Sequence, residues 1–443
     1  MKKFFEIISN IWKIEELRGR IIVTLGLLLV YRFGAQIVLP GIDTTQLAEL
    51  SSSTEQGILG LLNAFTGGAF ANASVFALGI MPYISASIVV QLMGIAVPYL
   101  QKLDKEGESG RKTKNQITRW LTIGICIVQA PAYLYSLGAL GVPDSAFLLG
   151  KGLNFIVPSV IILVTGCVFA MWLGEKITDK GIGNGISLLI MIGIIATMPQ
   201  SFVQEFISRT ANNTGGLMFI LIEVILWFIV IMASVLLVMA TRRIPVQYAR
   251  RSASGGYEKN IAGSRQYIPL KLNASGVMPI IFAQAIMFAP GLLGRTFNNT
   301  AVGQWMEVQF QDIFGLAYNI LFGVLIIIFT YFYTAITVPT NKMADDLKRS
   351  GGFIPGIRPG KETGDFLDKI MSLITLPGSV FLALLAVLPA VVVKLMDIQP
   401  GWALFYGGTS LLIMVGVAID TVQQVNSYLL NRHYDGLMKT GKN

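Results

Sequence analysis

The chain has 443 residues, of which 53% are hydrophobic and only 13% are charged, and its net charge at pH 7 is +9. An ordinary soluble domain has about a quarter of its residues charged. A soluble fold of this length could not bury so much apolar surface, so the composition excludes a soluble protein and predicts a membrane protein.

Residues 1–20 precede the first long apolar stretch. They include five basic and three acidic residues, and they lack the short apolar core and small-residue cleavage site of a secretory signal. Apolar residues recur at helical spacing, at Phe4, Ile7, Ile8, Ile11 and Ile14. The segment is therefore predicted to be an amphipathic helix on the membrane surface.

Ten apolar windows follow along the chain. A helix of about 20 apolar residues is long enough to cross the roughly 30 Å hydrocarbon core of a bilayer. The windows are residues 21–38, 74–97, 117–140, 155–174, 185–199, 217–240, 276–293, 313–338, 372–393 and 403–421. They predict an all-α polytopic membrane protein with ten transmembrane helices.

The connection between the first two windows breaks this pattern. Residues 60–72 are apolar but too short to span, and Gly60, Gly67 and Gly68 disfavour a firm helix by propensity alone. An apolar, glycine-jointed segment of this length is typical of a re-entrant piece lodged in a cavity of a membrane bundle. The alternative is a half-helix that lies on the membrane surface.

The basic residues predict the orientation. Of the 34 lysines and arginines, 29 lie in the N-terminal segment, in alternate connections (99–119, 175–183, 241–271 and 339–371) and in the tail. Cytoplasmic connections carry the basic excess, so both termini are predicted to be cytoplasmic. The basic face serves topogenesis and attracts anionic lipids, or it is a docking surface for an acidic partner; charge alone leaves both open.

The ten apolar windows divide into two sets of five along the chain. Residues 21–205 and 206–424 each hold five, and residues 425–443 form a tail. Because five is odd, the second half enters the membrane with the opposite orientation, which is the topology of an inverted repeat. Span counting permits two inverted five-helix halves without proving them, because no residue-level repeat is visible.

Residues for catalysis or metal binding are scarce. Cys126 and Cys167 lie inside apolar windows and are interpreted as small packing residues, and His433 is the single histidine, so no metal site is expected. The GIGNG run at 181–185 follows no strand and has no Gly-Lys-Ser/Thr, so nucleotide binding is not expected. We therefore expect no enzyme and no cofactor, with energy coming from a partner or from the ion gradient.

A secondary transporter of small solutes is the alternative class. Such proteins share inverted halves and polar groups at mid-membrane. Glu223 and Asp420 are the candidate ion-coupling acids, and each is the lone acid in its window.

Seven short sequence motifs, taken together, indicate a resemblance to a known protein family. They are AFTGGA at 64–69, FALGIMPYISAS at 76–87, KEGESGR at 105–111, MWLGE at 171–175, GIGNGIS at 181–187, FIPGIRPG at 353–360 and GGTSLLI at 407–413. From about Arg18 to about Tyr434 the sequence closely resembles the SecY family, the channel subunits of the bacterial protein translocon.

The resemblance implies a protein-conducting channel between two five-helix halves. A plug would close it from outside, formed by residues 60–72 around Asn63, Ala64, Phe65, Thr66, Gly67, Gly68, Ala69 and Phe70. A constriction ring would be formed by Ile80, Ile84, Ile186, Ile190, Ile281 and Ile413. Two of these pairs have i,i+4 spacing, so each pair shares one helix face.

The resemblance also implies a lateral gate that opens towards lipid, with Gln91 and Asn273 as its polar groups. Static packing between helices is the alternative role of Gln91. The connections 241–271 and 339–371 would receive the ribosome and the SecA motor, through Arg358 and, in the first connection, Arg250, Arg251 and Arg265. A stretch around Ser254 in this first connection departs from the family pattern. The implied partners are SecE, SecG, SecA, the ribosome and translocating polypeptides in the bacterial inner membrane.

Overall fold

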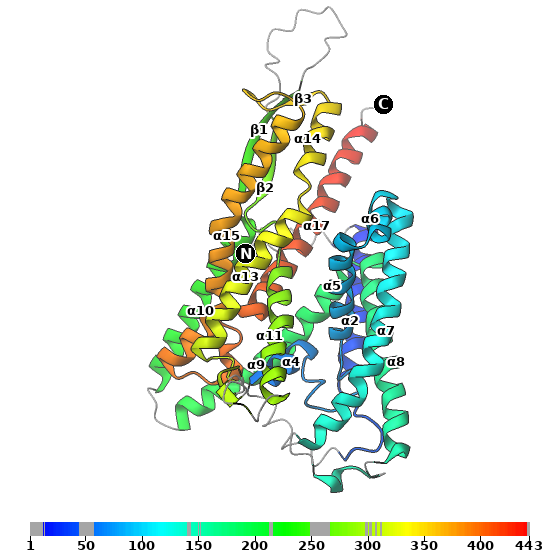
Figure 1. Cartoon of the computed structure of the whole chain (residues 1–443), viewed down its shortest axis with the longest axis vertical. Helices are drawn as coiled ribbons and strands as arrows, with labels where there is room; N and C mark the ends of the chain where they lie inside the picture. Colours follow the sequence, from blue (N-terminus) through cyan, green and yellow to red (C-terminus); the bar gives the residue numbers. More distant parts are fainter. Residues whose placement is uncertain are drawn as a thin grey trace, which may run out of the picture. The chain divides into compact units, whose positions relative to one another are not determined.

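The computed structural model describes Trp12 and residues 14–43, 57–139, 143–148, 150, 152–211, 216–248, 266–296, 300, 304–305, 308–310 and 312–440. Of the segment predicted as an N-terminal amphipathic helix, residues 1–11 and 13 lie outside the described residues, and residues 15–20 form the start of the first long helix. Figure 1 shows that long helices dominate the described chain.

Each predicted window overlaps one helix. In chain order these are α2 (Glu15–Gly34), α5 (Met81–Ala96), α7 (Glu108–Ala139), α8 (Leu153–Lys180), α9 (Gly185–Ala211), α10 (Gly216–Met239), α11 (Met278–Thr296), α13 (Leu316–Thr337), α15 (Lys361–Met396) and α17 (Gly408–Thr440). Among the described residues, seven helical stretches are long and apolar enough to cross a membrane, and α5 and α11 contain shorter apolar helices. The protein is a multi-span, mostly helical membrane protein.

Shorter elements lie between these helices. They are α4 (Gly57–Thr66), α6 (Pro98–Lys105), a 3-10 turn (Asp144–Ala146), β1 (Thr241–Tyr248), β2 (Gln266–Lys271), α14 (Thr340–Arg349), β3 (Gly352–Phe353) and α16 (Pro400–Ala403).

The chain forms two compact units. The first unit comprises Met1–Ile220, Asp397–Phe405 and Val417–Asn443, and the second comprises Leu221–Met396 and Tyr406–Gly416. The predicted division after residue 205 falls inside α9, which continues to Ala211. The two inverted halves stay a prediction.

Helix ends in the first unit have identifiable causes. Two acids, Glu15 and Glu16, lie in the first turn of α2, where the helix dipole favours negative charge. A proline at the start of α5 fits a position that needs no N–H donor. Asn184 caps α9, because its Oδ1 accepts hydrogen bonds from the N–H groups of Ile186 (3.1 Å) and Ser187 (3.3 Å).

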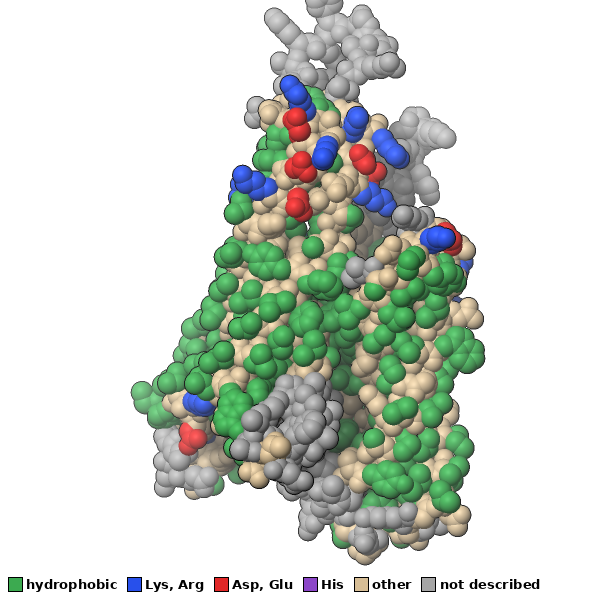
Figure 2. Space-filling model, in the orientation of Figure 1, with side chains coloured by type: hydrophobic (Ala, Val, Ile, Leu, Met, Phe, Trp, Pro, Cys, Tyr) green, Lys and Arg blue, Asp and Glu red, His purple; other side chains and the backbone are tan. Residues whose placement is uncertain are grey.

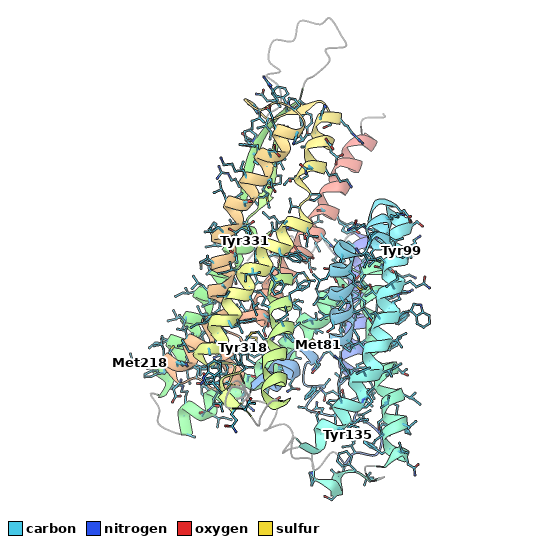
Figure 3. All side chains as sticks on the ribbon, viewed as in Figure 1. Met81, Tyr99, Tyr135, Met218, Tyr318 and Tyr331 are labelled. Atoms are coloured by element: carbon cyan, nitrogen blue, oxygen red, sulfur yellow. The ribbon has the colours of Figure 1, made fainter. Side chains whose placement is uncertain are left out.

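Exposed aromatic residues mark both ends of the first unit's bundle. Tyr99 and Tyr135 are 59% and 69% exposed, and Figure 3 shows them at opposite ends of the α6–α7 region. Trp120 is exposed as well. Tyrosine and tryptophan are enriched where a membrane meets water, so these side chains fit a bundle that spans a bilayer.

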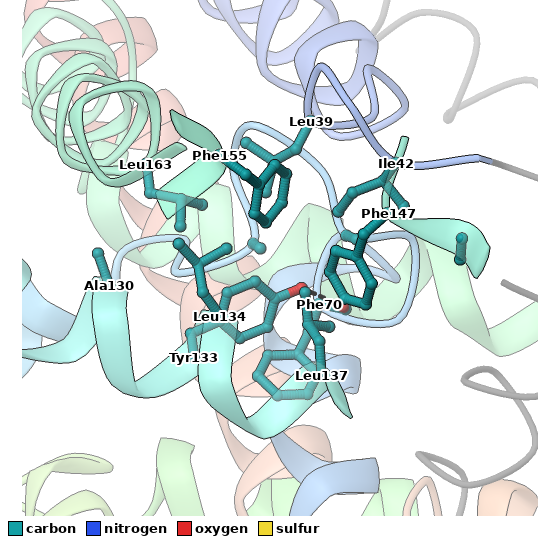
Figure 4. Close-up of a cluster of buried hydrophobic side chains, with 13 residues drawn as sticks. Leu39, Ile42, Phe70, Ala130, Tyr133, Leu134, Leu137, Phe147, Phe155 and Leu163 are labelled. Carbon is teal, nitrogen blue, oxygen red and sulfur yellow. Dashed lines mark hydrogen bonds between the residues drawn. The ribbon is translucent and has the colours of Figure 1, made fainter. Parts of the chain in front are cut away.

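The core of the first unit gathers around the end of α7. Leu39, Phe70, Tyr133, Leu137 and Phe155 are members of one buried apolar cluster, and Figure 4 shows their side chains converging from α7, α8 and two connecting segments. Phe70 belongs to the predicted plug. The apolar segment after α4 is therefore part of this core.

A small sheet in the second unit departs from the all-α prediction. Residues 241–271 were predicted only as a basic connection between helices. In the structure β1 and β2 pair antiparallel within it, with Ile244 opposite Ile268, and β3 joins β1 on its other side. Ile244 and Val246 alternate inward along β1. Period-2 burial of this kind stabilises a strand, and the windowed hydropathy of the sequence does not register it.

The sheet packs together with described residues of the second basic connection. Ile244, Val246, Leu270, Leu347 and Leu367 lie in one buried cluster, which joins the sheet to α14 and the start of α15. Residues 339–371 contain six basic and five acidic residues. Figure 2 shows both signs interspersed over α14 and the start of α15, so this surface carries mixed charge.

Candidate functional site: the plug segment and its contacts

The helix α4 ends in a glycine turn. Its last residue is Thr66, and Gly67 and Gly68 have positive φ values of 66° and 88°, a conformation that glycine adopts without a steric penalty. The Gly68 N–H donates to the Asn63 carbonyl (2.9 Å) and the Gly67 N–H to the Ala64 carbonyl (3.2 Å). These bonds satisfy carbonyls at the end of the helix. Helix propensity alone disfavoured a helix here, but the helix forms because burial of its side chains stabilises it.

The segment after α4 is held by its own polar side chains. Asn63 Oδ1 accepts a hydrogen bond from the Ala71 N–H (3.0 Å), and Thr66 Oγ1 accepts one from the Phe70 N–H (3.1 Å). Ala64, Phe65, Thr66, Ala69 and Phe70 are all buried. A half-helix lying on the membrane surface would expose one face, so the burial of these side chains favours the re-entrant segment over that alternative.

Residues of α2, α7 and α9 contact this segment. The Tyr133 hydroxyl of α7 donates to the Phe70 carbonyl (2.8 Å), and the two rings pack edge to face at 4.9 Å. Arg32 of α2 donates from Nη1 to the Gly67 carbonyl (2.9 Å). On α9, a Cβ at Gly193 would lie 2.7 Å from the Phe65 carbonyl oxygen, so the backbones approach closely.

Packing of Phe76 holds the connecting segment that leads into α5. Its ring stacks on Tyr31 (5.6 Å) and Phe169 (6.1 Å). It also fills the space beside Gly34 of α2, where a Cβ would collide with the ring, and lies 3.2 Å from a Cβ built at Gly166 of α8. The chain therefore enters α5 from a fixed position, which places Ile80 at its N-terminal cap.

The predicted ring isoleucines fall on four helices and in both units. In the first unit, Ile80 caps α5 and is buried, Ile84 on α5 is partly buried, and on α9 Ile190 is buried and Ile186 partly buried. The Ile84 N–H donates to the Ile80 carbonyl (3.0 Å), which confirms the helical spacing of that pair. Ile281 and Ile413 lie on α11 and α17 within the second unit. The ring itself stays a prediction.

The predicted gate residues also fall in different units. Gln91, on α5, is partly buried, and its Nε2 donates to Ser87 Oγ (3.3 Å). Asn273 is buried before α11, and its Oδ1 accepts from Ser275 Oγ (3.2 Å). Both are polar groups with local partners, and their role at a gate stays a prediction.

Arg358 lies on an exposed turn before α15. Its side chain is 88% exposed, and its Nη1 lies 3.8 Å from Glu362 Oε1. Gly356 and Gly360, with φ values of 86° and 112°, shape the turn, and Thr363 Oγ1 donates to the Arg358 carbonyl (2.8 Å). The guanidinium is thus presented to solvent. Arg250, Arg251 and Arg265 lie outside the described residues.

A buried ion pair was missed by the sequence analysis. Arg209 Nε lies 2.7 Å from Glu205 Oε1 on α9, and these side chains are only 6% and 2% exposed. Glu205 Oε2 accepts from the Gln399 N–H (2.8 Å), and Arg209 Nη2 donates to the Asp397 carbonyl (3.2 Å). The i,i+4 spacing of the two charges in a helix was the available signal.

The two acids of the transporter alternative are not equivalent. Glu223 is buried on α10, whereas Asp420 is exposed on α17. They also belong to different units. Within the described part of the chain, no group of three or more His, Cys, Asp or Glu residues is arranged to hold a metal ion.

The fold and these contacts define a class: a polytopic helical membrane protein with a short apolar helix packed inside one unit of its bundle. Comparison with known proteins identifies the family. A sequence model of SecY matches residues 74–422, and the protein translocase subunit SecY of Streptomyces coelicolor is 38% identical over 97% of this chain and 99% of its own length. The chain therefore belongs to the SecY family and is a protein translocation channel.

Solved structures agree in fold. A SecY channel studied for its plug domain matches with a TM-score of 0.61 and 20% identity, over 93% of this chain and 92% of that chain. Sec61 from a canine ribosome–channel complex matches with a TM-score of 0.55 and 17% identity, over 93% and 92% of the two chains. None of these comparisons supports a solute transporter.

Proposed function

We propose that this channel passes unfolded secretory polypeptides through a constriction lined by the six ring isoleucines, and that residues 60–72 plug it at rest. The burial of the plug segment against α2, α7 and α9 supports this assignment most directly. The plug domain of the similar SecY structure is described as stabilising the closed state of its channel and maintaining a membrane seal.

Isoleucine suits such a constriction. Its side chain carries no hydrogen-bond donor or acceptor, so a ring of six would exclude water and ions by dewetting. The same side chains offer no specific contact to a passing chain, which lets polypeptides of any sequence move through. The branched Cβ restricts the rotamers and keeps the opening well defined.

Crosslinking tests the path. A photoreactive residue is placed at Ile84, Ile190 or Ile413, and a secretory precursor is arrested during transport. We expect crosslinks from these three positions and none from Val89 and Ile195, which lie on α5 and α9 but are exposed. A precursor that reacts with the two exposed positions instead would contradict the proposed path.

Release into lipid would occur at the proposed lateral gate beside Gln91 and Asn273. Polar contacts between membrane helices contribute about 0.6 kcal/mol on average, which would favour closure and still allow a hydrophobic signal sequence to open the gate. We place the channel in the bacterial inner membrane with both termini in the cytoplasm, in line with the distribution of its basic residues. SecE and SecG would be its small membrane partners.

We assign docking of the SecA motor and the ribosome to the structure formed by the sheet, α14 and the turn at Arg358. The chain has no nucleotide-binding loop, so we propose that it is not an enzyme and takes its energy from SecA, from the ribosome or from the ion gradient. The mixed charge of residues 339–371 favours specific contacts by exposed guanidinium groups over general attraction to anionic lipid or RNA.

Reversal of charge at Arg358 tests this surface. Because Arg358 is exposed and has one weak ion pair, Arg358→Glu should lower the affinity for the motor about 10- to 100-fold, the effect of losing a charged hydrogen bond. Insertion and abundance should stay normal. Translocation into inverted vesicles measures the effect, with Lys394→Glu, an exposed base in a predicted outer connection, as control. Equal transport by both variants would rule out the assignment.

A further inference from the structure

Arg32 is a charged residue where the sequence otherwise avoids charge. It is the single charged residue between positions 21 and 42, and it lies in the last turn of α2. Under the predicted topology this turn is at the outer end of the first span, where few bases occur. A charge within a membrane helix is unfavourable, and such residues face protein groups that stabilise them.

The partner of Arg32 is the plug segment. Nη1 donates to the carbonyl of Gly67, 35 positions along the chain, at 2.9 Å. Gly67 is the first residue after α4, so the guanidinium lies at the negative end of that helix's dipole. The hydrogen bond is charge-assisted, and bonds of this kind are about twice as strong as those between neutral groups.

The contact leaves no room for a side chain at position 67. A Cβ on Gly67 would collide with Arg32 Nη1 and would lie 2.8 Å from the Cα of Gly193 on α9. The glycine turn is thus enclosed by α2 on one side and α9 on the other. An arginine that only balanced its own helix dipole would require neither this enclosure nor a carbonyl acceptor from a distant segment.

We propose that Arg32 is a positioning residue that keeps the plug segment seated in the resting channel. Unseating breaks its bond to Gly67 and leaves a guanidinium in an apolar helix without that acceptor, so the seated state is the default. This inference rests on the proposed role of residues 60–72 as the plug. It further identifies the hydrogen bond from Arg32 to the Gly67 carbonyl as one that must break when the channel opens.

Labelling of a buried cysteine tests the proposal in the full chain. Cys126 and Cys167 are replaced by alanine, and Ala69→Cys is introduced within the plug segment, where Ala69 is fully buried. The probe is a membrane-impermeant maleimide added to the outer face of spheroplasts. Arg32→Gln should raise the labelling rate about 10- to 100-fold, the effect of losing one charged hydrogen bond. Arg32→Lys, which keeps the charge, should raise it less.

Two controls separate seating from general loosening. Arg18→Met changes an exposed arginine of the same helix and should leave labelling unchanged. Ala403→Cys reports a fully buried site on α16, outside the plug segment and outside the buried cluster that contains Phe70, and Arg32→Gln should not accelerate its labelling. Equal acceleration at both cysteines would overturn the proposal, as would an unchanged rate at Ala69→Cys.

A second variant and a second readout complete the test. If Arg32→Gln does not accumulate, Gly67→Ala disturbs the same contact from the other side, and an unchanged labelling rate in that variant overturns the proposal. Ion leak and export of a precursor are measured in the same cells. Faster labelling with unchanged leak and export would support the Arg32 contact and contradict the assignment of residues 60–72 as the plug.

Discussion

Replacing Glu205 with glutamine is expected to lower the free energy of unfolding by about 3–5 kcal/mol, the usual effect of removing one partner of a buried ion pair. Glutamine keeps an oxygen that can accept from the Gln399 N–H. The loss of stability therefore arises mainly because the charge of Arg209, whose side chain is only 6% exposed, no longer has the Glu205 carboxylate beside it. The measurement is the thermal unfolding midpoint of the purified protein in detergent, which should fall markedly.

The first unit contains a matched control. Glu16 and Arg20 form an i,i+4 pair on α2 with the same residue types, but their side chains are 68% and 30% exposed. Exposed pairs of this kind contribute less than about 1 kcal/mol, so Glu16→Gln should scarcely move the midpoint. The double change Glu205→Met with Arg209→Met should destabilise less than Glu205→Gln, because no buried charge remains. If Glu16→Gln and Glu205→Gln had equal effects, burial would not be the cause.

The Glu205–Arg209 pair also stabilises a segment outside α9. Glu205 and Arg209 bind the backbone at Gln399 and Asp397, which lie about 190 positions later in the chain. Asp397 has a positive φ of 53°, and Trp402 in the same segment packs against Phe202 of α9 at 5.1 Å. The pair thus holds the connection between α15 and α17 within the first unit, and its loss should loosen that connection first.

Replacing Gly193 with alanine is expected to unseat the plug segment. The new Cβ would lie 2.7 Å from the Phe65 carbonyl oxygen and 3.2 Å from the Gly67 nitrogen, and these backbone atoms can only move together with the segment. Overpacking of this kind costs about 1–3 kcal/mol, which would raise the unseated population about 5- to 150-fold. Ion leak through idle channels in proteoliposomes should rise accordingly.

Gly124 provides the control for this change. It lies within α7 and is exposed, and a Cβ added to it would have no atom within 4 Å. Alanine there should stabilise the helix by up to about 1 kcal/mol and leave ion leak unchanged. If Gly193→Ala also left the leak unchanged, the close approach of α9 to the plug segment would have no part in the seal.

The predicted helices and the observed helices agree because apolar length is a local property. Each of the ten windows overlaps one helix, including α10, whose window is interrupted only by Glu223. Helix ends were less predictable. Pro199 was taken as the end of the fifth window, yet α9 continues through it to Ala211, because neighbouring groups in a bundle can satisfy the carbonyl that a proline leaves free.

The candidate site was only partly predictable. The segment 60–72 stood out because it is apolar, short and rich in glycine, and the structure buries it. Arg32 was visible as a lone charge, but nothing in the sequence pointed to the Gly67 carbonyl as its acceptor. The roles of Tyr133 and Gly193 were not visible at all, because a tyrosine and a glycine in apolar helices have many possible neighbours.

Hydropathy and short motifs are local properties of the chain, and they were sufficient to predict the class of protein, the positions of the apolar helices and the family resemblance. Three features became visible only in the folded chain. They are the residues that hold the plug segment, the pairing of β1 with β2 inside a basic connection, and the contacts of Glu205 and Arg209 with Gln399 and Asp397. The reason is physical. These contacts join residues up to about 190 positions apart, and their energy arises from burial and hydrogen bonds that exist only after the chain has folded.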